Sequence, residues 1–343
     1  MPHVSIIIKA LNEERHIGAA LRSALDAAGL VDGEVILADS GSTDSTVEIA
    51  RALPVTVLQL SNPAERRCGI GPQLGYQVAS GAFVYVLDGD MELDRNFLPA
   101  ALAALAAAPR LAGVAGVVEE ESDASYQFRG RKRRAREGRA QDCEWLDMGG
   151  LYRVAALREV GYLSNRNLHA FEEMELGLRL VAAGWSLQRL ARRSVVHHGR
   201  REGNWSLLAG RWRSRYLDGA GELLRAARGM PFFGRVVRSQ AHLFVATVLW
   251  LGVIAGAALW PVSHWPLLAC LMALLSLIAI RTVRTRNLAD AVFGQVVWQV
   301  TALAMIRGYF TPQKNPRSDI DFRVLAHAYQ RRTQAVDVPP AAV

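Results

Sequence analysis

The chain has 343 residues, of which 51% are hydrophobic, and its formal net charge is +8 at pH 7. Its three cysteines, Cys68, Cys143 and Cys270, have no paired spacing, which argues against a disulfide scaffold or a zinc site and favours a reducing compartment. No basic stretch followed by an apolar stretch opens the chain, so no signal peptide is expected.

The N-terminal part alternates short apolar runs with segments of helical periodicity. Asn12 is expected to cap the first helix. The regular order of strand and helix predicts an α/β fold with a mostly parallel sheet that helices cover on both faces. Strands are expected at residues 4–9, 34–38, 55–60, 82–87 and 111–118, and helices at 13–26, 47–53, 73–79 and 97–108.

Residues 119–144 are charged and lack periodicity, so we expect a loop there, and this loop contains the basic run from Arg129 to Arg139. Gly184 stands where a glycine often ends a helix. Helices are expected near residues 154–160 and 171–183, and strand-like segments follow at 185–190 and 194–197.

After residue 204 the composition changes. Residues 205–238 mix arginine with aromatic and apolar side chains, a pattern typical of a basic amphipathic segment at a membrane surface. Residues 239–310 are expected to form membrane helices. Prolines divide the uncharged part into two spans of roughly 17 to 22 residues, each able to cross ~30 Å of hydrocarbon, and a third candidate at 291–306 is marginal. Residues 311–343 are expected to be a polar tail.

Arginines flank the first two spans on their outer ends, and the connection between the spans has none. The excess of positive charge in cytoplasmic segments predicts that both outer ends lie in the cytoplasm. The sequence therefore favours a protein of the cytoplasmic (inner) membrane, with its N-terminal domain on the cytoplasmic side.

Polar residues follow three of the predicted strands. Asp88 and Asp90 come after the strand at 82–87, Asp39 after the second strand, and Asn12 with Glu13 after the first. In an open parallel sheet, ligands bind beyond the carboxyl ends of the strands. Two carboxylates there can bind a divalent cation that also binds diphosphate oxygens, although each residue alone could equally be part of a turn or a helix cap.

Two further groups of residues could carry chemistry. Glu172 and Glu173 open a helix, where acids often serve only the helix dipole, but one of them could be a general base. Glu175 and Arg179 have the spacing of a structural ion pair. His197, which follows an apolar strand with His198, is either a third metal ligand or a buried histidine with satisfied hydrogen bonds.

Taken together, six segments over residues 4–200 resemble, in the correct order, the inverting glycosyltransferases of family 2, which have the GT-A fold. The resemblance assigns residues 1–204 to a GT-A domain. The segments are VSIIIKALNEE, EVILADSGSTDST, GPQLGYQVASGAFVYVLDGDME, GGLYRVAALREVGYL, HAFEEMELGLRLVAAGW and SVVHHG.

The resemblance implies a role for each matching residue. Asp39 would read the nucleotide base, with Asn12 and Glu13 nearby. Asp88 would bind the donor diphosphate. Glu173 would be the catalytic base, where the family more often has aspartate. Mg²⁺ or Mn²⁺ would be bound by Asp90, Asp88 and His197.

The sequence departs from the family at further places, among them Leu11, which stands where tyrosine is common. Lys9 stands where proline is common. The QxxRW signature of processive polysaccharide synthases is absent from its expected place, which favours transfer of a single sugar.

The expected function is transfer of a sugar, with inversion, from a nucleotide-sugar to a hydroxyl of a glycan or lipid-linked glycan acceptor in cell-envelope or exopolysaccharide synthesis. A UDP-sugar is the family default. Two alternatives are a polyprenyl-phosphate glycosyl synthase and a catalytically inactive membrane adaptor with a GT-A fold. Membrane lipids are expected partners. Nucleic acid is not, because residues 129–139 lack interleaved aromatic side chains.

Overall fold

The computed structural model describes residues 4–121, 141–147, 149–199 and 203–328. The expected basic loop from Arg129 to Arg139 lies outside these residues. The chain divides into two compact units. Unit 1 comprises residues 1–168, 172–201 and 313–343, and unit 2 comprises residues 169–171 and 202–312.

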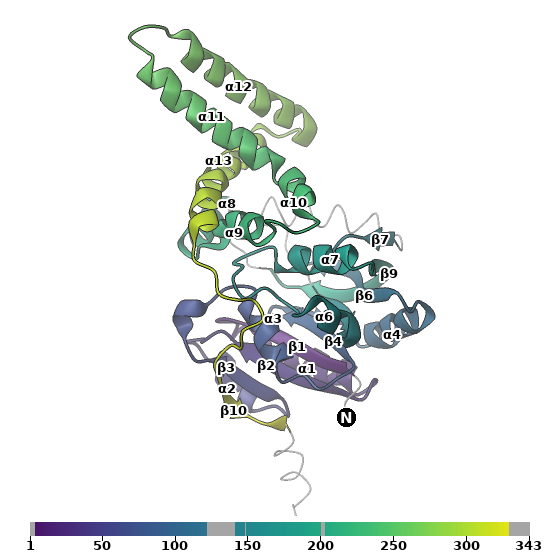
Figure 1. Ribbon diagram of the computed structural model, residues 1–343. Helices are drawn as coiled ribbons and strands as arrows, with labels where there is room; N and C mark the ends of the chain where they lie inside the picture. The colour runs from purple at the N-terminus through teal and green to yellow at the C-terminus, as the bar shows by residue number, and fades with distance from the viewer. Residues whose placement is uncertain (1–3, 122–140, 148, 200–202, 329–343) are drawn as a thin grey trace, which may run out of the picture. The chain divides into compact units, whose positions relative to one another are not determined.

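Unit 1 is built on one mixed sheet, in which the strands β3, β2, β1 and β4 are parallel and the strands flanking them include antiparallel pairs (Figure 1). The spatial order is β10-β3-β2-β1-β4-β8-β6-β9-β5, and β7 pairs with β9. The strands are β1 (Val4–Ala10), β2 (Gly33–Asp39), β3 (Thr56–Leu60), β4 (Phe83–Asp88), β5 (Met91–Leu93), β6 (Leu111–Glu120), β7 (Gln141–Cys143), β8 (Gly150–Arg153), β9 (Ser186–His197) and β10 (Phe322–Ala326).

Helices cover both faces of this sheet, because strands that are apolar on both sides need two cores. In β1, Ile6 and Ile8 pack in the core formed with α1 and α4, whereas Ile7 packs in the core formed with α3, α6 and α7. All three isoleucines are fully buried. The helices are α1 (Ile17–Ala28), α2 (Thr46–Arg51), η1 (Pro63–Glu65), α3 (Ile70–Tyr76), α4 (Phe97–Ala107), α6 (Val154–Val160) and α7 (Glu172–Ala182). The predicted α/β architecture is confirmed.

The prediction that Asn12 caps the first helix is wrong. Helix α1 begins at Ile17 with His16 at its N-cap, and Asn12 has a left-handed backbone with φ of 56°. The Asn12 Oδ1 instead accepts a hydrogen bond of 2.8 Å from the backbone N–H of Thr43. Asparagine tolerates this left-handed conformation better than most residues, which suits it to the turn.

The tail also differs from expectation. Residues 322–326 form β10, which pairs antiparallel with β3 at the edge of the sheet. The segment expected to be a polar tail therefore follows unit 2 in the chain and adds a strand to unit 1.

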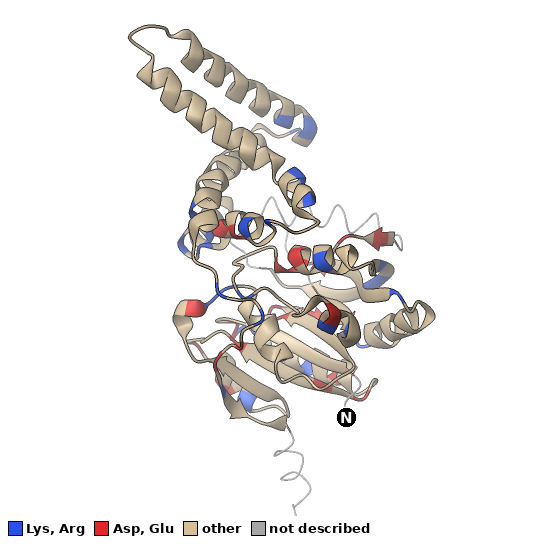
Figure 2. Ribbon diagram, viewed as in Figure 1, with Lys and Arg blue, Asp and Glu red and all other residues tan. Residues whose placement is uncertain are grey.

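Unit 2 contains three helices that are long and apolar enough to cross a membrane, α11 (Ala241–Ala258), α12 (Trp265–Thr285) and α13 (Leu288–Phe310). Figure 2 shows that α11 and most of α12 carry no charged residues, with Lys and Arg appearing only at the end of α12. The basic segment before them consists of α8 (Asn204–Arg213), η2 (Tyr216–Asp218), α9 (Gly219–Ala226) and α10 (Phe233–Ser239).

Helix α13 is held tightly by the short helices of unit 2. The Arg307 guanidinium binds the fully buried Asp218 at 2.6 Å, and Arg215 binds the same carboxylate at 2.9 Å. A Cβ at Gly221 would overlap the backbone of Met305, so only glycine lets α9 approach α13 this closely. The marginal third segment is therefore a full helix whose second half packs against protein.

Candidate active site

The site lies at the carboxyl ends of the central parallel strands. In the register of the sheet, Lys9 of β1 is aligned with Asp88 of β4, and Ala10 of β1 is aligned with Asp39 of β2. Asp39, Lys9 and Asp88 are therefore neighbours along one edge, which is where open α/β sheets bind ligands.

Asp39 shapes the turn that follows β2. Its carboxylate is fully buried and accepts hydrogen bonds from the Gly41 and Ser42 backbone N–H groups at 2.9 Å each, and from Gln59 Nε2 at 3.0 Å. Gly41 has φ of 88°, a conformation that glycine adopts without strain. The immediate function of Asp39 is to fix the Ser-Gly-Ser turn.

Asn12 and Glu13 tie the end of β1 to this turn. The Asn12 backbone N–H donates to Ser42 Oγ at 2.8 Å, and the Glu13 backbone N–H donates to Thr46 Oγ1 at 2.8 Å. A Cβ at Gly89 would lie 3.2 Å from Glu13 Cγ, so Glu13 also borders the Asp-Gly-Asp segment. The structure thus brings together the residues expected to bind the donor.

Asp90 and His197 form the second part of the site. Strand β5 pairs with β9, and this pairing places His197 Nε2 3.3 Å from Asp90 Oδ2. On its other side, His197 Nδ1 lies 2.8 Å from the buried Glu120 Oε2 at the end of β6. Burial opposes a charge on His197, but its hydrogen bonds to Asp90 and Glu120 raise its pKa to about 9.

This arrangement fits a divalent cation held by Asp90 and His197. A histidine that binds metal usually gives its other ring nitrogen to a carboxylate, which fixes the ring, and Glu120 does this here. Asp88, the third expected ligand, lies instead against Lys9. Within the part of the chain that the structure describes, no group of three or more His, Cys, Asp or Glu residues is arranged to hold a metal ion.

Lys9 connects the strand ends to helix α7. Its Nζ lies 3.1 Å from Asp88 Oδ1 and 2.9 Å from Glu172 Oε1. Burial disfavours the charge on Lys9, but Asp88, Glu172 and Glu173 together raise its pKa well above the ordinary value. Burial raises the pKa of Asp88, which Lys9 partly offsets.

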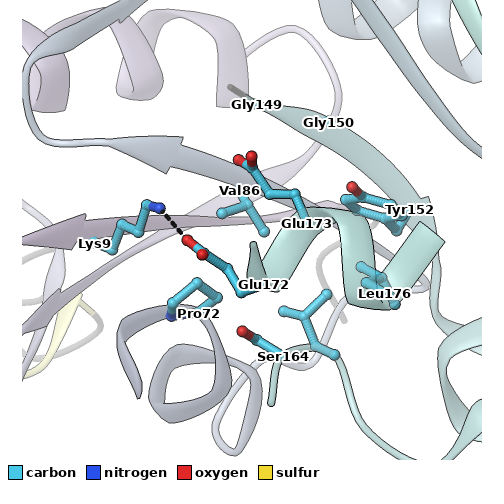
Figure 3. Close-up of a pocket in the computed structure, with 11 residues that line it drawn as sticks. Lys9, Pro72, Val86, Gly149, Gly150, Tyr152, Ser164, Glu172, Glu173 and Leu176 are labelled. Atoms are coloured by element: carbon cyan, nitrogen blue, oxygen red, sulfur yellow. Dashed lines mark hydrogen bonds and ion pairs between the residues drawn. The ribbon is translucent and has the colours of Figure 1, made fainter. Parts of the chain in front are cut away.

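Glu173 lines a pocket next to this ion pair. Figure 3 shows that Glu172 points toward Lys9, whereas Glu173 extends in another direction, toward Gly149. Burial raises the pKa of Glu173 well above its ordinary value; the charge of Lys9 opposes this rise, and the charges of Glu172 and Asp88 add to it. A carboxyl with a raised pKa in a pocket is suited to take up a proton near neutral pH. The pocket is lined by Lys9, Val86, Tyr152, Ser164, Glu172 and Glu173, among others.

The side chain of His198, unlike that of His197, pairs with two other carboxylates. Its Nδ1 lies 2.7 Å from Glu121 and its Nε2 lies 2.7 Å from Glu92. Of the two adjacent histidines, the structure therefore places the one expected from the sequence beside Asp90.

Sequence reasoning missed Glu120 and gave Lys9 no role. The predicted strand ends at residue 118 and leaves Glu120 in a loop, whereas β6 continues to Glu120. A signal for Lys9 was present, since a single charge at the end of an apolar strand is costly unless it is paired.

Residues 5–164 match the family described as Glycosyl transferase family 2. No curated protein sequence is significantly similar to the chain.

Solved structures resemble the chain at low sequence identity. The mannosyltransferase PcManGT from Pyrobaculum calidifontis, in complex with GDP-Man and Mn²⁺, is 17% identical, with 90% of this chain and 86% of that chain covered and a TM-score of 0.52. Residues 1–349 of TarS from S. aureus, in complex with UDP-GlcNAc, are 16% identical, with 87% and 90% covered and a TM-score of 0.47. The likeness to PcManGT shows a shared fold.

Proposed function

The chain carries a domain of glycosyl transferase family 2, and from this premise we propose that it is a membrane-anchored, metal-dependent glycosyltransferase. It transfers a sugar, with inversion, from a nucleotide-sugar, by proposal a UDP-sugar, to a hydroxyl of a glycan or lipid-linked glycan. The pathway proposed is cell-envelope or exopolysaccharide synthesis at the cytoplasmic membrane. The observation that carries the proposal is the Asp90–His197 pair at the end of the sheet, together with the half-buried carboxyl of Glu173 in the pocket beside the Lys9–Asp88 pair.

On this proposal, Asp90 and His197 hold Mg²⁺ or Mn²⁺, with Glu120 orienting the imidazole. The bound ion supplies positive charge that stabilises the departing nucleoside diphosphate. Asp39, Asn12 and Glu13 form the donor end of the site, and Asp88 lies between this end and α7, held by Lys9.

Glu173 acts as the general base. It takes the proton from the acceptor hydroxyl while the acceptor oxygen forms a bond to the anomeric carbon of the sugar. The bond from that carbon to the diphosphate oxygen breaks on the opposite face, so the anomeric configuration inverts. Glu173 lines the pocket next to the Lys9–Glu172 ion pair, where an acceptor hydroxyl could reach it.

The test is turnover of a panel of nucleotide-sugars by the full chain in membranes with Mn²⁺, with products identified by mass spectrometry. Glu173→Gln and Asp90→Asn should each lower turnover by about a hundredfold or more. Asp26→Asn, an exposed carboxylate on α1, is the matched control and should not change it. Turnover by Glu173→Gln equal to that of the unmodified chain would remove Glu173 from the mechanism.

The same assay separates the two alternatives. A polyprenyl phosphate acceptor is already anionic and needs no base, so unchanged transfer to polyprenyl phosphate by Glu173→Gln would indicate a polyprenyl-phosphate glycosyl synthase. Absence of transfer and of donor hydrolysis with every nucleotide-sugar would indicate an inactive adaptor. The position of Glu173 in the wall of the pocket favours the hydroxyl acceptor.

A further inference from the structure

In unit 2, an arginine and a histidine from two helices contact the indole ring of a tryptophan on a third helix. His242 comes from the first turn of α11, Arg281 from the last turns of α12, and Trp298 from α13. The Arg281 Cζ lies 4.4 Å from the centre of the Trp298 ring, and the His242 ring lies 5.0 Å from the same ring. Because the three residues belong to three helices, the cluster depends on the packing of the whole bundle.

Gly294 makes room for the guanidinium. A Cβ at this position would lie 2.7 Å from Arg281 Cζ and would overlap Nη2. Gly294 and Trp298 are four residues apart and share one helix face. The Arg281 guanidinium therefore packs against the backbone of α13 at Gly294 and against the indole ring of Trp298.

Within the described part of unit 2, polar atoms of two residues near this helix end are buried without a hydrogen-bond partner. Among the described residues, Arg281 Nη1 is buried without a hydrogen-bond partner, as are both amide atoms of Gln295. Gln295 is only 3% exposed and lies next to Gly294 in α13. Buried polar groups are nearly always hydrogen-bonded, and leaving one unpaired costs about 1–3 kcal/mol. The charge of a guanidinium that is partly removed from water is stabilised by an anion.

The position of the cluster indicates which anion. Helix α12 has 21 residues, long enough to cross ~30 Å of hydrocarbon at ~1.5 Å per residue. Arg281 lies four residues before its end at Thr285, or ~6 Å along the axis. In the membrane placement proposed above, Arg281 lies ~6 Å inside the helix end, a depth from which an arginine side chain can extend to the lipid phosphates. The planar guanidinium matches phosphate oxygens with two parallel hydrogen bonds.

We propose that Arg281, with His242 and Trp298 beside it, forms a binding site for a phosphoryl oxyanion at the end of the α11–α12 hairpin. The oxyanion is carried by a lipid headgroup or by free phosphate. The site rests on the proposed membrane placement of the hairpin, but it does not depend on the transferase activity.

The test is native mass spectrometry of the full chain in detergent micelles with phosphatidic acid, and with diacylglycerol as the lipid that lacks phosphate. Arg281→Gln and Gly294→Ala, which displaces the guanidinium, should each weaken phosphatidic acid binding by about tenfold. Arg284→Gln is the matched control, because Arg284 is an exposed arginine one turn along the same helix. It should change binding less than twofold, and diacylglycerol should not bind the site.

Competition by inorganic phosphate identifies the source of the oxyanion. Displacement of phosphatidic acid by millimolar inorganic phosphate supports the site with free phosphate as its occupant, and failure to displace it supports the lipid. Unchanged binding in both Arg281→Gln and Gly294→Ala, with melting temperatures preserved, would overturn the proposal and leave Arg281 a structural partner of Trp298. An equal loss in Arg284→Gln would overturn it too, because binding would then follow charge alone.

Turnover of nucleotide-sugars is measured on the same variants. A chain that binds phosphatidic acid through Arg281 but turns over no donor would refute the transferase proposal and leave the phosphoryl site standing. A chain that turns over a nucleotide-sugar but whose phosphatidic acid binding does not depend on Arg281 would refute the phosphoryl site and leave the transferase proposal standing.

Discussion

At the scale of single residues, Lys9 is the side chain on which the candidate site most depends for its charge balance. It is 17% exposed and pairs with Asp88 and Glu172, which come from two other elements. Removing one partner of a buried ion pair leaves a buried charge uncompensated. Lys9 therefore offsets the repulsion between the carboxylates that lie at this edge of the sheet.

Lys9→Met should lower the free energy of unfolding of unit 1 by about 3 kcal/mol or more. Lys9→Arg keeps the charge and should cost clearly less. Thermal unfolding of the full chain in detergent, followed by tryptophan fluorescence, measures both. Equal melting temperatures for Lys9→Met and the unmodified chain would show that the pairs with Asp88 and Glu172 contribute little.

The raised pKa of Glu173 leads us to expect that the free energy of unfolding depends on pH. Because burial raises its pKa in the folded state above the unfolded value, the folded chain binds a proton that the unfolded chain has released. Its contribution to stability is therefore lost as pH rises from the unfolded pKa to the folded pKa. Glu173→Gln should remove this loss and stabilise the chain at alkaline pH by ~0.5–2 kcal/mol, while abolishing transfer. A melting temperature at pH 8.5 below that of the unmodified chain would contradict this.

At the scale of elements, strand β10 shows how the chain closes unit 1 after leaving unit 2. Arg166, which is 4% exposed, donates hydrogen bonds to the Ser318 and Asp319 carbonyls at 3.0 and 2.7 Å and binds Glu65 at 2.6 Å. These contacts hold the segment that leads into β10.

Arg166→Ala should therefore release this segment. We expect faster limited proteolysis between residues 313 and 328 and a loss of about 2–4 kcal/mol, because buried acceptors and Glu65 lose their partner. Arg323→Ala is the control, since Arg323 is exposed on β10 itself. Equal cleavage rates in the two variants would mean that strand pairing, and not Arg166, anchors the segment.

Elements with strong local periodicity were predictable from the sequence. Helix α6 has the predicted bounds of 154–160, and α7 ends close to Gly184, whose φ is 81°. The predicted pair of Glu175 and Arg179 is present at 2.8 Å. Each of these depends on residues close together in the chain.

The rest depends on contacts between residues far apart. The start of α1 was misplaced because Asn12 bonds to Thr43, 31 residues away. Strand β10 escaped prediction because its partner β3 lies more than 260 residues earlier in the chain. In the candidate site, strand ends revealed Asp39, Asp88 and Asp90, but the Glu120–His197 bond and the Lys9 pairs required the folded sheet.

At the scale of the whole molecule, the proposal places an α/β domain on the cytoplasmic side of a membrane, anchored by helices of unit 2. The connection between α11 and α12 should then lie on the outer side. Val262, which is 84% exposed in this connection, is a suitable labelling position for the outer side. Arg228, which is exposed in unit 2 before α10, is the corresponding labelling position for the inner side.

In a chain whose three native cysteines are replaced by serine, Val262→Cys should react with a membrane-impermeant maleimide in intact cells. Arg228→Cys should react only after the membrane is permeabilised. Labelling of Arg228→Cys, but not Val262→Cys, in intact cells would reverse the proposed orientation.

The central claim is that Asp90, His197 and Glu173 belong to one metal-assisted catalytic centre. Transfer at this centre inverts the anomeric configuration of the sugar. The most direct measurement is the anomeric configuration of the transfer product by nuclear magnetic resonance, with Mn²⁺ and with a chelator. The account predicts a product of opposite configuration to the donor, formed with Mn²⁺ and lost with the chelator or in Asp90→Asn. A product that retains the donor configuration, or full transfer by Asp90→Asn in the presence of chelator, would contradict it.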